Sequence, residues 1–340
     1  MGTIAKNCVD VTNEMWQQVN EFNRNLVKEF LEYKVELSEQ SKIQYISNLR
    51  IFFWWVHENL GDKNCIEIKK KEFVRYLNWL ASKGLSESAI KLKKSVVSSL
   101  CNYISEYYED EYPTFRSFVT SSMKVIQTGY VHEKIPLTTE EYNKLCEKLE
   151  ELEKWQILAW LKFSYSSGCR RGESRQLLKE VVTYPPIIKE IDITDENGNK
   201  TKAKSISYKT HKIRCKGKGQ VGKIRKLQFS EDAMQAMKKW LEVRGDDDCP
   251  YMFAVKGHEE KIHQVSEYTI GEWCSGLLTK LVGRRVHPHL LRASRASNIV
   301  VEEGKSVETA QKLLGHESSE TTVKHYIIRD DTDDADEAFV

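Results

Sequence analysis

Five short motifs in the second half of the chain carry basic and imidazole side chains in a fixed order that ends on a tyrosine. Guanidinium groups suit a phosphate that gains charge, because their forked donors match two oxygens at once. A phenol that loses its proton is a nucleophile, and a lysine can protonate the oxygen that leaves. The set therefore predicts phosphodiester cleavage by side chains. The motifs are Gly168-Cys169-Arg170-Arg171-Gly172-Glu173, Lys216-Gly217-Lys218-Gly219, His289-Leu290-Leu291-Arg292, Leu314-Gly315-His316 and Tyr326.

Each motif taken singly has a plainer interpretation. Arg170 and Glu173 would begin a surface helix with their charges in solvent. The lysines and glycines around Lys218 would form a flexible basic turn that touches phosphates without specificity. Tyr326 alone would be a buried tyrosine. It is the order of all five that favours a single site.

Metal and redox chemistry have weaker support in the sequence. His287 and His289 would suit a metal, but no cluster of cysteines or carboxylates lies near them. The eight cysteines are scattered without a Cys-x-x-Cys pair, so neither a zinc site nor a disulfide framework is expected. Cys169 lies within the first motif, which leaves a redox role open for it. No metal and no cofactor are expected.

The length and charge of the chain are compatible with a nucleic-acid partner. At 340 residues the chain is long for one core, so two domains are expected. The formal net charge is +2, but residues 330–340 hold six acidic residues and no Lys or Arg, so the remainder carries +8. No apolar run approaches the ~20 residues of a membrane helix. No apolar signal core begins the chain, so we expect a cytoplasmic protein without membrane contact.

Apolar residues at helical spacing predict a helical first domain over residues 1–125. Its aromatic residues are interpreted as core rather than as base-stacking groups. Lys91, Lys93 and Lys94 leave a basic face on the fourth helix, which suits either solvent or DNA. The predicted helices span 16–30, 41–59 and 70–82, with a fourth after the capping residue Ser86.

The second domain, 136–329, follows a linker at 126–135 and mixes helices with short strands. Thr138 and Glu141 have capping-box spacing ahead of a first helix, and an apolar helix over 155–166 ends at Gly168. From Ser230 the pattern is again mostly helical, until the acidic tail 330–340. The expected fold class is mainly α with a small antiparallel β-sheet. Its strand pairs would be 189–193 with 204–208, and 208–216 with 223–229.

The order of the motifs resembles that of the tyrosine recombinase family, the phage-integrase type. The stretch from about 134 to 326 resembles the family's mixed α/β catalytic domain motif by motif. The helical half resembles its core-binding domain, with 84–104 similar to the fourth helix and 40–56 to an earlier one. One departure is Ala293, where the family often has another histidine after the arginine.

The resemblance implies a phosphate-binding set. Arg170 and Arg292 would bind the scissile phosphate, and Glu173 would hold and orient Arg170. His316 would hydrogen-bond the same phosphate. The spacing of His289 and Arg292 places both on one face of a helix.

The resemblance also implies the groups that move protons and attack phosphorus. Tyr326, ten residues after His316, would be the nucleophile that forms a 3′-phosphotyrosyl bond. His289 would take or share its proton. Lys218 on the hairpin turn would protonate the leaving 5′ oxygen, with Lys216 and Lys223 as rivals. Contacts to the DNA backbone are expected from Lys91, Lys94, Lys212, Arg214, Lys216, Lys223 and Arg225.

These residues together predict a site-specific DNA recombinase or integrase that cleaves and rejoins duplex DNA and exchanges strands through a Holliday junction. The resemblance implies a homotetramer on two sites, needing neither ATP nor metal, and leaves room for accessory DNA-bending proteins. We expect Phe339 and Val340, at the tip of the acidic tail, to dock on a neighbouring subunit. The alternatives are a type IB topoisomerase, a DNA-binding regulator without activity, and a helical adaptor whose charged motifs are coincidental.

Overall fold

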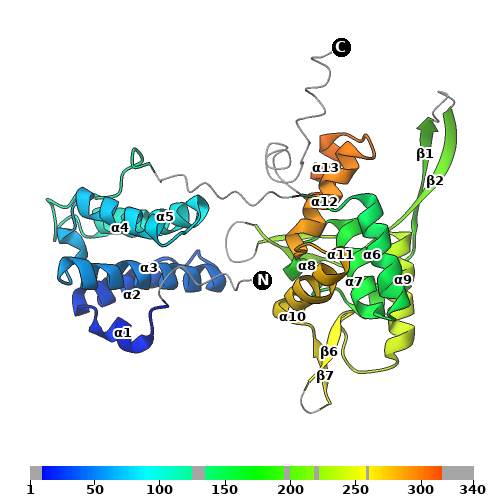
Figure 1. Cartoon of the computed structure of the whole chain (residues 1–340), viewed down its shortest axis with the longest axis horizontal. Coiled ribbons are helices and arrows are strands. Elements are labelled where there is room, and N and C mark those ends of the chain that lie inside the picture. The colour runs from blue at the N-terminus through cyan, green and yellow to red at the C-terminus, as the bar shows by residue number, and fades with distance from the viewer. Residues whose placement is uncertain (1–9, 125–134, 195–199, 218–221, 258–259, 316–340) are drawn as a thin grey trace. The chain divides into compact units, whose positions relative to one another are not determined.

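The chain folds into two compact units, Met1–His132 and Glu133–Val340 (Figure 1). The computed structural model describes residues 10–124, 135–194, 200–217, 222–257 and 260–315. The predicted linker, apart from Ile135, and the acidic tail therefore lie outside the described residues. Among the helices that are described, none combines the length and the apolar character needed to cross a membrane.

The regular secondary structure in the described part of the first unit is entirely helical. Serine and asparagine side chains cap several of them, and Ser86 accepts the backbone N–H of Ala89 at 3.3 Å, as its sequence position predicts. Gly61 ends the longest helix with φ +63°, a conformation that favours glycine. The elements are α1 (Asn13–Gln18), α2 (Glu21–Tyr33), α3 (Glu39–Leu60), the 3-10 turn η1 (Cys65–Glu67), α4 (Lys70–Ser82) and α5 (Glu87–Tyr107).

The expected single helix over 16–30 is wrong, because it is two helices that break at Val19 and Asn20. The Asn20 side chain accepts the backbone N–H of Asn23 at 2.8 Å and its amide donates to the carbonyl of Asp62. Asparagine competes for backbone partners in this way, so it starts a helix better than it continues one.

Aromatic side chains fill the core of the first unit, as the sequence predicts. Phe52, Phe53, Phe73 and Tyr76 are fully buried and in ring contact, with Phe52 and Tyr76 meeting edge to face at 5.0 Å between centroids. Phe118, from the segment after α5, packs on the same group. These rings stabilise the helical unit and are not available to bases.

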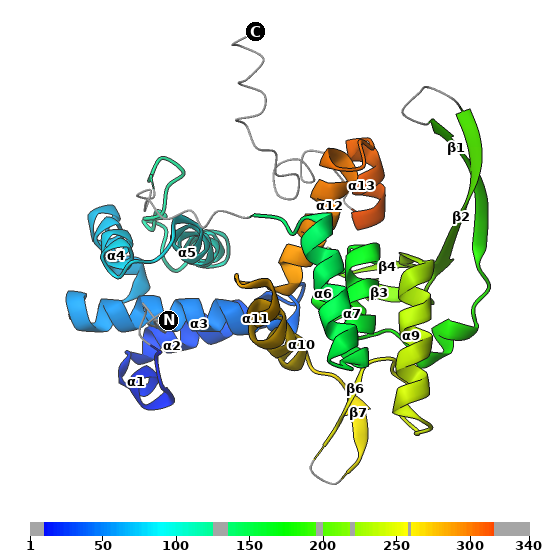
Figure 2. The same ribbon diagram turned by 45° about the vertical axis from the view of Figure 1, so that its right-hand side comes forward.

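The second unit surrounds α7, which is buried on most of its sides. Its residues Leu158, Trp160, Leu161 and Phe163 are almost inaccessible to solvent. The helices α6, α9 and α12 all contact it, and α6, α7 and α9 lie side by side in both views (Figures 1 and 2). The helices are α6 (Thr139–Glu151), α7 (Trp155–Ser167), α8 (Arg171–Ser174), α9 (Glu231–Arg244), α10 (Glu267–Trp273), α11 (Thr279–Val282), α12 (Pro288–Val301) and α13 (Val307–Leu314), with a 3-10 turn η2 (Lys179–Thr183) and a π-helical turn η3 (Cys274–Leu278).

The strands of the second unit are all antiparallel. The pair β1 and β2 forms a long ribbon that extends beyond the helices, and β5 joins it at the base (Figure 2). Two further hairpins, β3 with β4 and β6 with β7, stand apart from it in the described residues. The strands are β1 (Ile187–Thr194), β2 (Lys200–Lys209), β3 (Ile213–Cys215), β4 (Lys223–Arg225), β5 (Gln228–Ser230), β6 (Ala254–Lys256) and β7 (Ile262–Gln264).

The described residues confirm the expected class, mainly α with small antiparallel sheets, and correct two details. The strand pair expected over 208–216 and 223–229 is interrupted at buried Thr210. The backbone N–H of Thr210 donates to the carbonyl of Leu227, and the hydroxyl of Thr210 accepts the backbone N–H of Leu227. The pairing therefore changes from β2 with β5 to β3 with β4. The stretch after Ser230 also contains the β6–β7 hairpin, whose strands are too short to show a pattern.

Candidate active site

The first arginine motif forms the junction between α7 and α8. Gly168 ends α7 with φ +57°, and Arg170 is the N-terminal capping residue of α8. Glu173 completes a capping box by accepting the backbone N–H of Arg170 at 3.0 Å. The same carboxylate accepts Nη1 of Arg170 at 2.8 Å. Arg170 is thereby fixed through both its backbone and its side chain, while a quarter of that side chain stays exposed.

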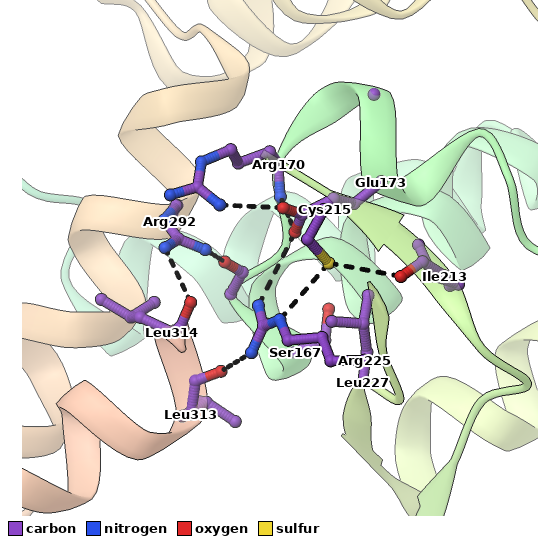
Figure 3. A network of polar contacts seen from close by, with 12 residues as sticks. Ser167, Arg170, Glu173, Ile213, Cys215, Arg225, Leu227, Arg292, Leu313 and Leu314 are labelled. Carbon is purple, nitrogen blue, oxygen red and sulfur yellow. Dashed lines mark hydrogen bonds and ion pairs between the residues drawn. The ribbon is translucent and has the colours of Figure 1, made fainter. Parts of the chain in front are cut away.

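Glu173 is a buried carboxylate between two guanidinium groups. Its side chain is 3% exposed, and Nη2 of Arg225 lies 3.7 Å from Oε2 (Figure 3). Burial alone would raise the pKa of Glu173, but the backbone N–H and guanidinium of Arg170, together with Arg225, lower that pKa below its usual value. The group is therefore an anion at neutral pH and orients both arginines.

Arg292 is fully buried on α12 and joins two helix ends. Its Nη1 donates to the carbonyl of Gly168 at the end of α7, and its Nη2 donates to the carbonyl of Leu314 at 2.9 Å (Figure 3). The guanidinium thus brings the first, third and fourth motifs together. The carbonyl ends of two helices carry partial negative charge, which suits a cation between them.

His289 lies one turn before Arg292 and is exposed. Partial desolvation of the ring, and then the nearby charges of Arg292, His287, Arg170 and Arg171, lower the pKa of His289 below its usual 6.5. The imidazole is therefore neutral at pH 7 and able to accept a proton. His287 has a different role, because its Nδ1 accepts the backbone N–H of Leu290 at 3.1 Å and caps α12.

The β3–β4 hairpin presents basic side chains beside Glu173 and Arg170. Lys212, Arg214 and Lys216 are exposed, and Lys223 is half-buried. Lys218, the favoured general acid, lies in 218–221 and outside the described residues. Arg225 points inward to Glu173 and α13 (Figure 3).

The last two motif residues, His316 and Tyr326, also lie outside the described residues. The description ends at Gly315, which caps α13 with φ +67°. The chain therefore enters the His316–Tyr326 segment from a point next to Arg292.

The first unit has its own polar groove, of about 440 Å³, between α5, Tyr45 and residues 119–121. Lys91 and Lys94 line it together with Ser95, Ser98 and Asn102. The predicted basic face is smaller than expected, because Lys93 is buried and donates to Oδ1 of Asn48 at 2.7 Å. Lys93 therefore holds α5 to α3 from a buried position.

Cysteines near the site are buried thiols. Burial raises the pKa of Cys169 to about 11, so this thiol stays protonated and unreactive at neutral pH.

Cys215 accepts Nε of Arg225 at 3.4 Å, a contact that no sequence pattern indicated. The ion pair between Arg171 and Glu267, at 2.9 Å, likewise joins α8 to α10 from distant positions.

Comparison of the sequence with known families gives a match across most of the second unit. The model of the phage integrase family matches residues 136–332, and that of the phage integrase N-terminal SAM-like domain matches 25–106. The chain belongs to the phage integrase family. Members of this family cleave and rejoin DNA, and the chain is an enzyme of its tyrosine recombinase class.

Two curated members show how far the similarity reaches. The integrase is 36% identical over 337 residues to the SPbeta prophage-derived recombinase-like protein YomM of Bacillus subtilis, covering 97% of this chain and 95% of that protein. It is 26% identical over 297 residues to tyrosine recombinase XerA of Thermococcus onnurineus, covering 86% and 87%.

Solved structures show the same fold at low sequence identity. The Tn1549 transposon integrase in complex with transposon right end DNA matches with a TM-score of 0.63 and 16% identity, covering 93% of this integrase and 98% of that chain. A lambda integrase tetramer bound to a Holliday junction matches with a TM-score of 0.57 and 16% identity, covering 91% and 77%.

Proposed function

We propose that the integrase is a site-specific recombinase that cleaves and rejoins duplex DNA through a 3′-phosphotyrosyl intermediate and a Holliday junction, with Tyr326 as nucleophile. The observation that carries the proposal is the bridge made by Arg292 between Gly168 and Leu314. This bridge gathers three of the five motifs around one point. Arg170 and His289 keep exposed surface there, and the segment that leads to His316 and Tyr326 starts there.

The phosphate would be held by guanidinium groups. Arg170, fixed by Glu173, meets the non-bridging oxygens, with Arg292 beneath it and His316 as a further donor. The charge that develops on those oxygens in the transition state is stabilised by these cations and needs no metal. Because Glu173 fixes Arg170 before DNA binds, little ordering remains to be done during the reaction.

The reaction would move one proton at each end of an in-line displacement. The phenol oxygen of Tyr326 attacks phosphorus while neutral His289 accepts its proton. The bond from phosphorus to the 5′ oxygen breaks, and Lys218 gives that oxygen a proton. Attack by a 5′ hydroxyl from the partner duplex reverses these steps, so the phosphotyrosyl bond conserves the energy and ATP is not required.

DNA would contact both units. The groove with Lys91 and Lys94 suits a phosphate backbone, since its lining is cationic and rich in hydroxyl and amide donors. The exposed Lys212, Arg214 and Lys216 of the hairpin supply a second cationic surface.

The working assembly we propose is a homotetramer on two sites, acting in the cytoplasm where the DNA is. The lambda integrase tetramer on a Holliday junction, which shares the fold, supports this assembly. The acidic tail, outside the described residues, would dock Phe339 and Val340 on the next subunit. Removing 330–340 should then lower the yield of tetramer on DNA, and an unchanged yield would exclude this role.

A covalent-adduct assay tests the proposal. Duplexes are first selected from a random library by binding, and are then nicked so that the short fragment that carries the released 5′ hydroxyl diffuses away. The integrase should form an adduct that survives denaturant, and Tyr326→Phe should form none. Tyr268→Phe, which changes a 75% exposed tyrosine on α10, is the matched control and should retain the adduct. Adduct formation by Tyr326→Phe would show that another residue is the nucleophile.

Relaxation, cleavage and binding assays with the wild-type integrase distinguish the proposed recombinase from the three alternatives. A type IB topoisomerase would relax supercoiled plasmid without a selected site, whereas the proposed recombinase acts only on plasmid that contains one. A regulator without activity would bind the selected duplex and form no adduct. A helical adaptor would bind neither selected nor random duplex in a salt-dependent way.

A further inference from the structure

Arg225 is a basic hairpin residue whose guanidinium turns away from solvent. Its side chain is 22% exposed, whereas its hairpin neighbours Arg214 and Lys216 are exposed. Figure 3 shows the guanidinium between the hairpin, α8 and the end of α13. This placement does not suit a contact with the DNA backbone, the role first expected from its position among lysines.

Each nitrogen of Arg225 meets a different segment. Nε donates to Sγ of Cys215, on the paired strand, at 3.4 Å. Nη1 donates to the carbonyl of Leu313, in the last turn of α13, at 3.0 Å. Nη2 is buried and forms an ion pair with Oε2 of Glu173 at 3.7 Å. Only a planar fork with donors on three nitrogens can make this set of contacts.

The other side of the guanidinium is covered by Gly315. A Cβ added at Gly315 would come within 2.7 Å of Cζ and 3.0 Å of Nε of Arg225. The backbone at this glycine therefore fits directly against the guanidinium. Gly315 is also the last described residue before the segment with His316 and Tyr326.

Resting on the function proposed above, we propose that Arg225 is the positioning residue of the β3–β4 hairpin. It holds the hairpin against α8 and α13, and so fixes the place where the lysine of the turn meets the leaving oxygen. Arg225 itself contacts no reacting atom. Its loss should slow cleavage by misplacing the general acid, while the affinity for DNA stays the same.

The first experiment compares two arginine-to-lysine variants. Arg225→Lys keeps the charge and loses the fork, so its single-turnover cleavage should fall by about 100-fold with an unchanged Kd for selected duplex. Arg244→Lys is the control, because Arg244 is 4% exposed and even more extensively bonded, through Asp247 and three carbonyls, but lies in a network apart from the motifs. It should lower the melting temperature and leave the cleavage rate of the folded protein unchanged. The proposal would be overturned if Arg225→Lys cleaved DNA at the wild-type rate. It would also be overturned if the variant lost cleavage and binding in parallel, as a general folding defect would cause.

The second experiment uses DNA with sulfur in place of the 5′ bridging oxygen. A thiolate leaves without a proton because its pKa is far below that of an alcohol. The defect of Arg225→Lys should largely disappear on this substrate, as should that of Lys218→Ala, whereas Arg170→Lys should remain slow. If Arg225→Lys remains slow while Lys218→Ala recovers, Arg225 acts on the phosphate-binding group and our assignment to the hairpin is wrong.

The third measurement does not depend on activity. Hydrogen exchange of backbone amides in 213–215 and 223–225 should accelerate in Arg225→Lys and stay unchanged in Arg244→Lys. Unchanged protection of the hairpin would contradict a positioning role even if cleavage is slow. The two proposals can fail separately. If the wild-type protein formed no adduct but the hairpin of Arg225→Lys exchanged faster, the proposed function would fail and the structural role of Arg225 would stand.

Discussion

Arg292 donates from Nη2 to the carbonyl oxygen of Leu314 at 2.9 Å, across 22 positions of the chain. Nη1 of the same guanidinium donates to the carbonyl of Gly168, 124 positions away. Both carbonyls lie at the C-terminal end of a helix, where the last carbonyl groups have no partner within the helix. A buried cation at this point satisfies them and joins α7, α12 and α13 before any phosphate is present.

The first prediction concerns this bridge. Arg292→Lys keeps a cation but cannot reach two carbonyls with a planar fork, so one or both are left buried without a donor. The free energy of unfolding should fall by about 2–4 kcal/mol, measured by urea denaturation. Arg295→Lys, on the same helix but partly exposed and paired with partly exposed Glu303, should change it by less than about 1 kcal/mol. Equal losses in the two variants would contradict a structural role for the bridge.

The second prediction concerns the contact between Gly168 and Leu314. A Cβ at Gly168 would lie 2.6 Å from Cδ2 of Leu314, and φ at this position is +57°. Gly168→Ala should therefore cost backbone strain of about 1 kcal/mol and an additional 1–3 kcal/mol of overpacking. Gly283→Ala isolates the strain, because Gly283 has φ +81° and no atom within 4 Å of an added Cβ. The difference between the two variants in urea denaturation should be positive, and a difference of zero would show that Leu314 moves aside without cost.

Much of the fold is predictable because local rules decide it. The capping residues Ser86 and Thr138, the glycine at 168 and the helix over 70–82 all lie where the sequence places them. Asn20 was missed, because the apolar spacing continues through it while its side chain starts a new helix. A periodic stripe shows which face is buried but not whether the backbone is continuous.

The site was predictable as a set of residues but not as a set of contacts. The order of the motifs singled out Arg170, His289 and Arg292, which the structure places near one another. It did not distinguish Arg225 and Lys93, which turn inward, from the exposed basic residues beside them. That direction depends on partners such as Leu313 and Asn48 at distant positions, and spacing along one strand or helix does not reveal them.

The third prediction concerns the groove of the first unit. If Lys91 neutralises a DNA phosphate, Lys91→Ala should reduce the slope of log Kd against log salt concentration by about 1. The matched control is Lys144→Ala on α6, since both lysines are exposed and both form an i, i+4 pair with a glutamate, Lys91 with Glu87 and Lys144 with Glu140. Fluorescence anisotropy with selected duplex at several salt concentrations measures the slope. The same reduction in both variants would indicate general electrostatics rather than a contact in the groove.

The fourth prediction concerns the protonation of His289. Its folded pKa is lowered, first by burial and then by the neighbouring cations, so the neutral form is favoured in the folded protein. Between the folded pKa and the unfolded value near 6.5, the unfolded chain binds more protons at this histidine than the folded protein does. The free energy of unfolding therefore decreases as the pH falls below about 6.5. His289→Gln removes the titrating group. Its free energy of unfolding should therefore decline less than that of the wild type between pH 7 and pH 5.

The same titration should govern cleavage by the free enzyme. A protonated imidazole cannot accept the tyrosine proton, so the single-turnover rate at subsaturating DNA should fall on the acidic side with a midpoint below 6.5. His289→Gln should be slower at neutral pH by about 10²-fold to 10⁴-fold and should lack this acidic limb. His287→Gln is the control, because His287 caps α12 through Nδ1 and takes no proton from the nucleophile. It should retain the limb, although loss of the neighbouring imidazole shifts the midpoint slightly upward. An acidic limb that survives in His289→Gln would assign the proton to another group.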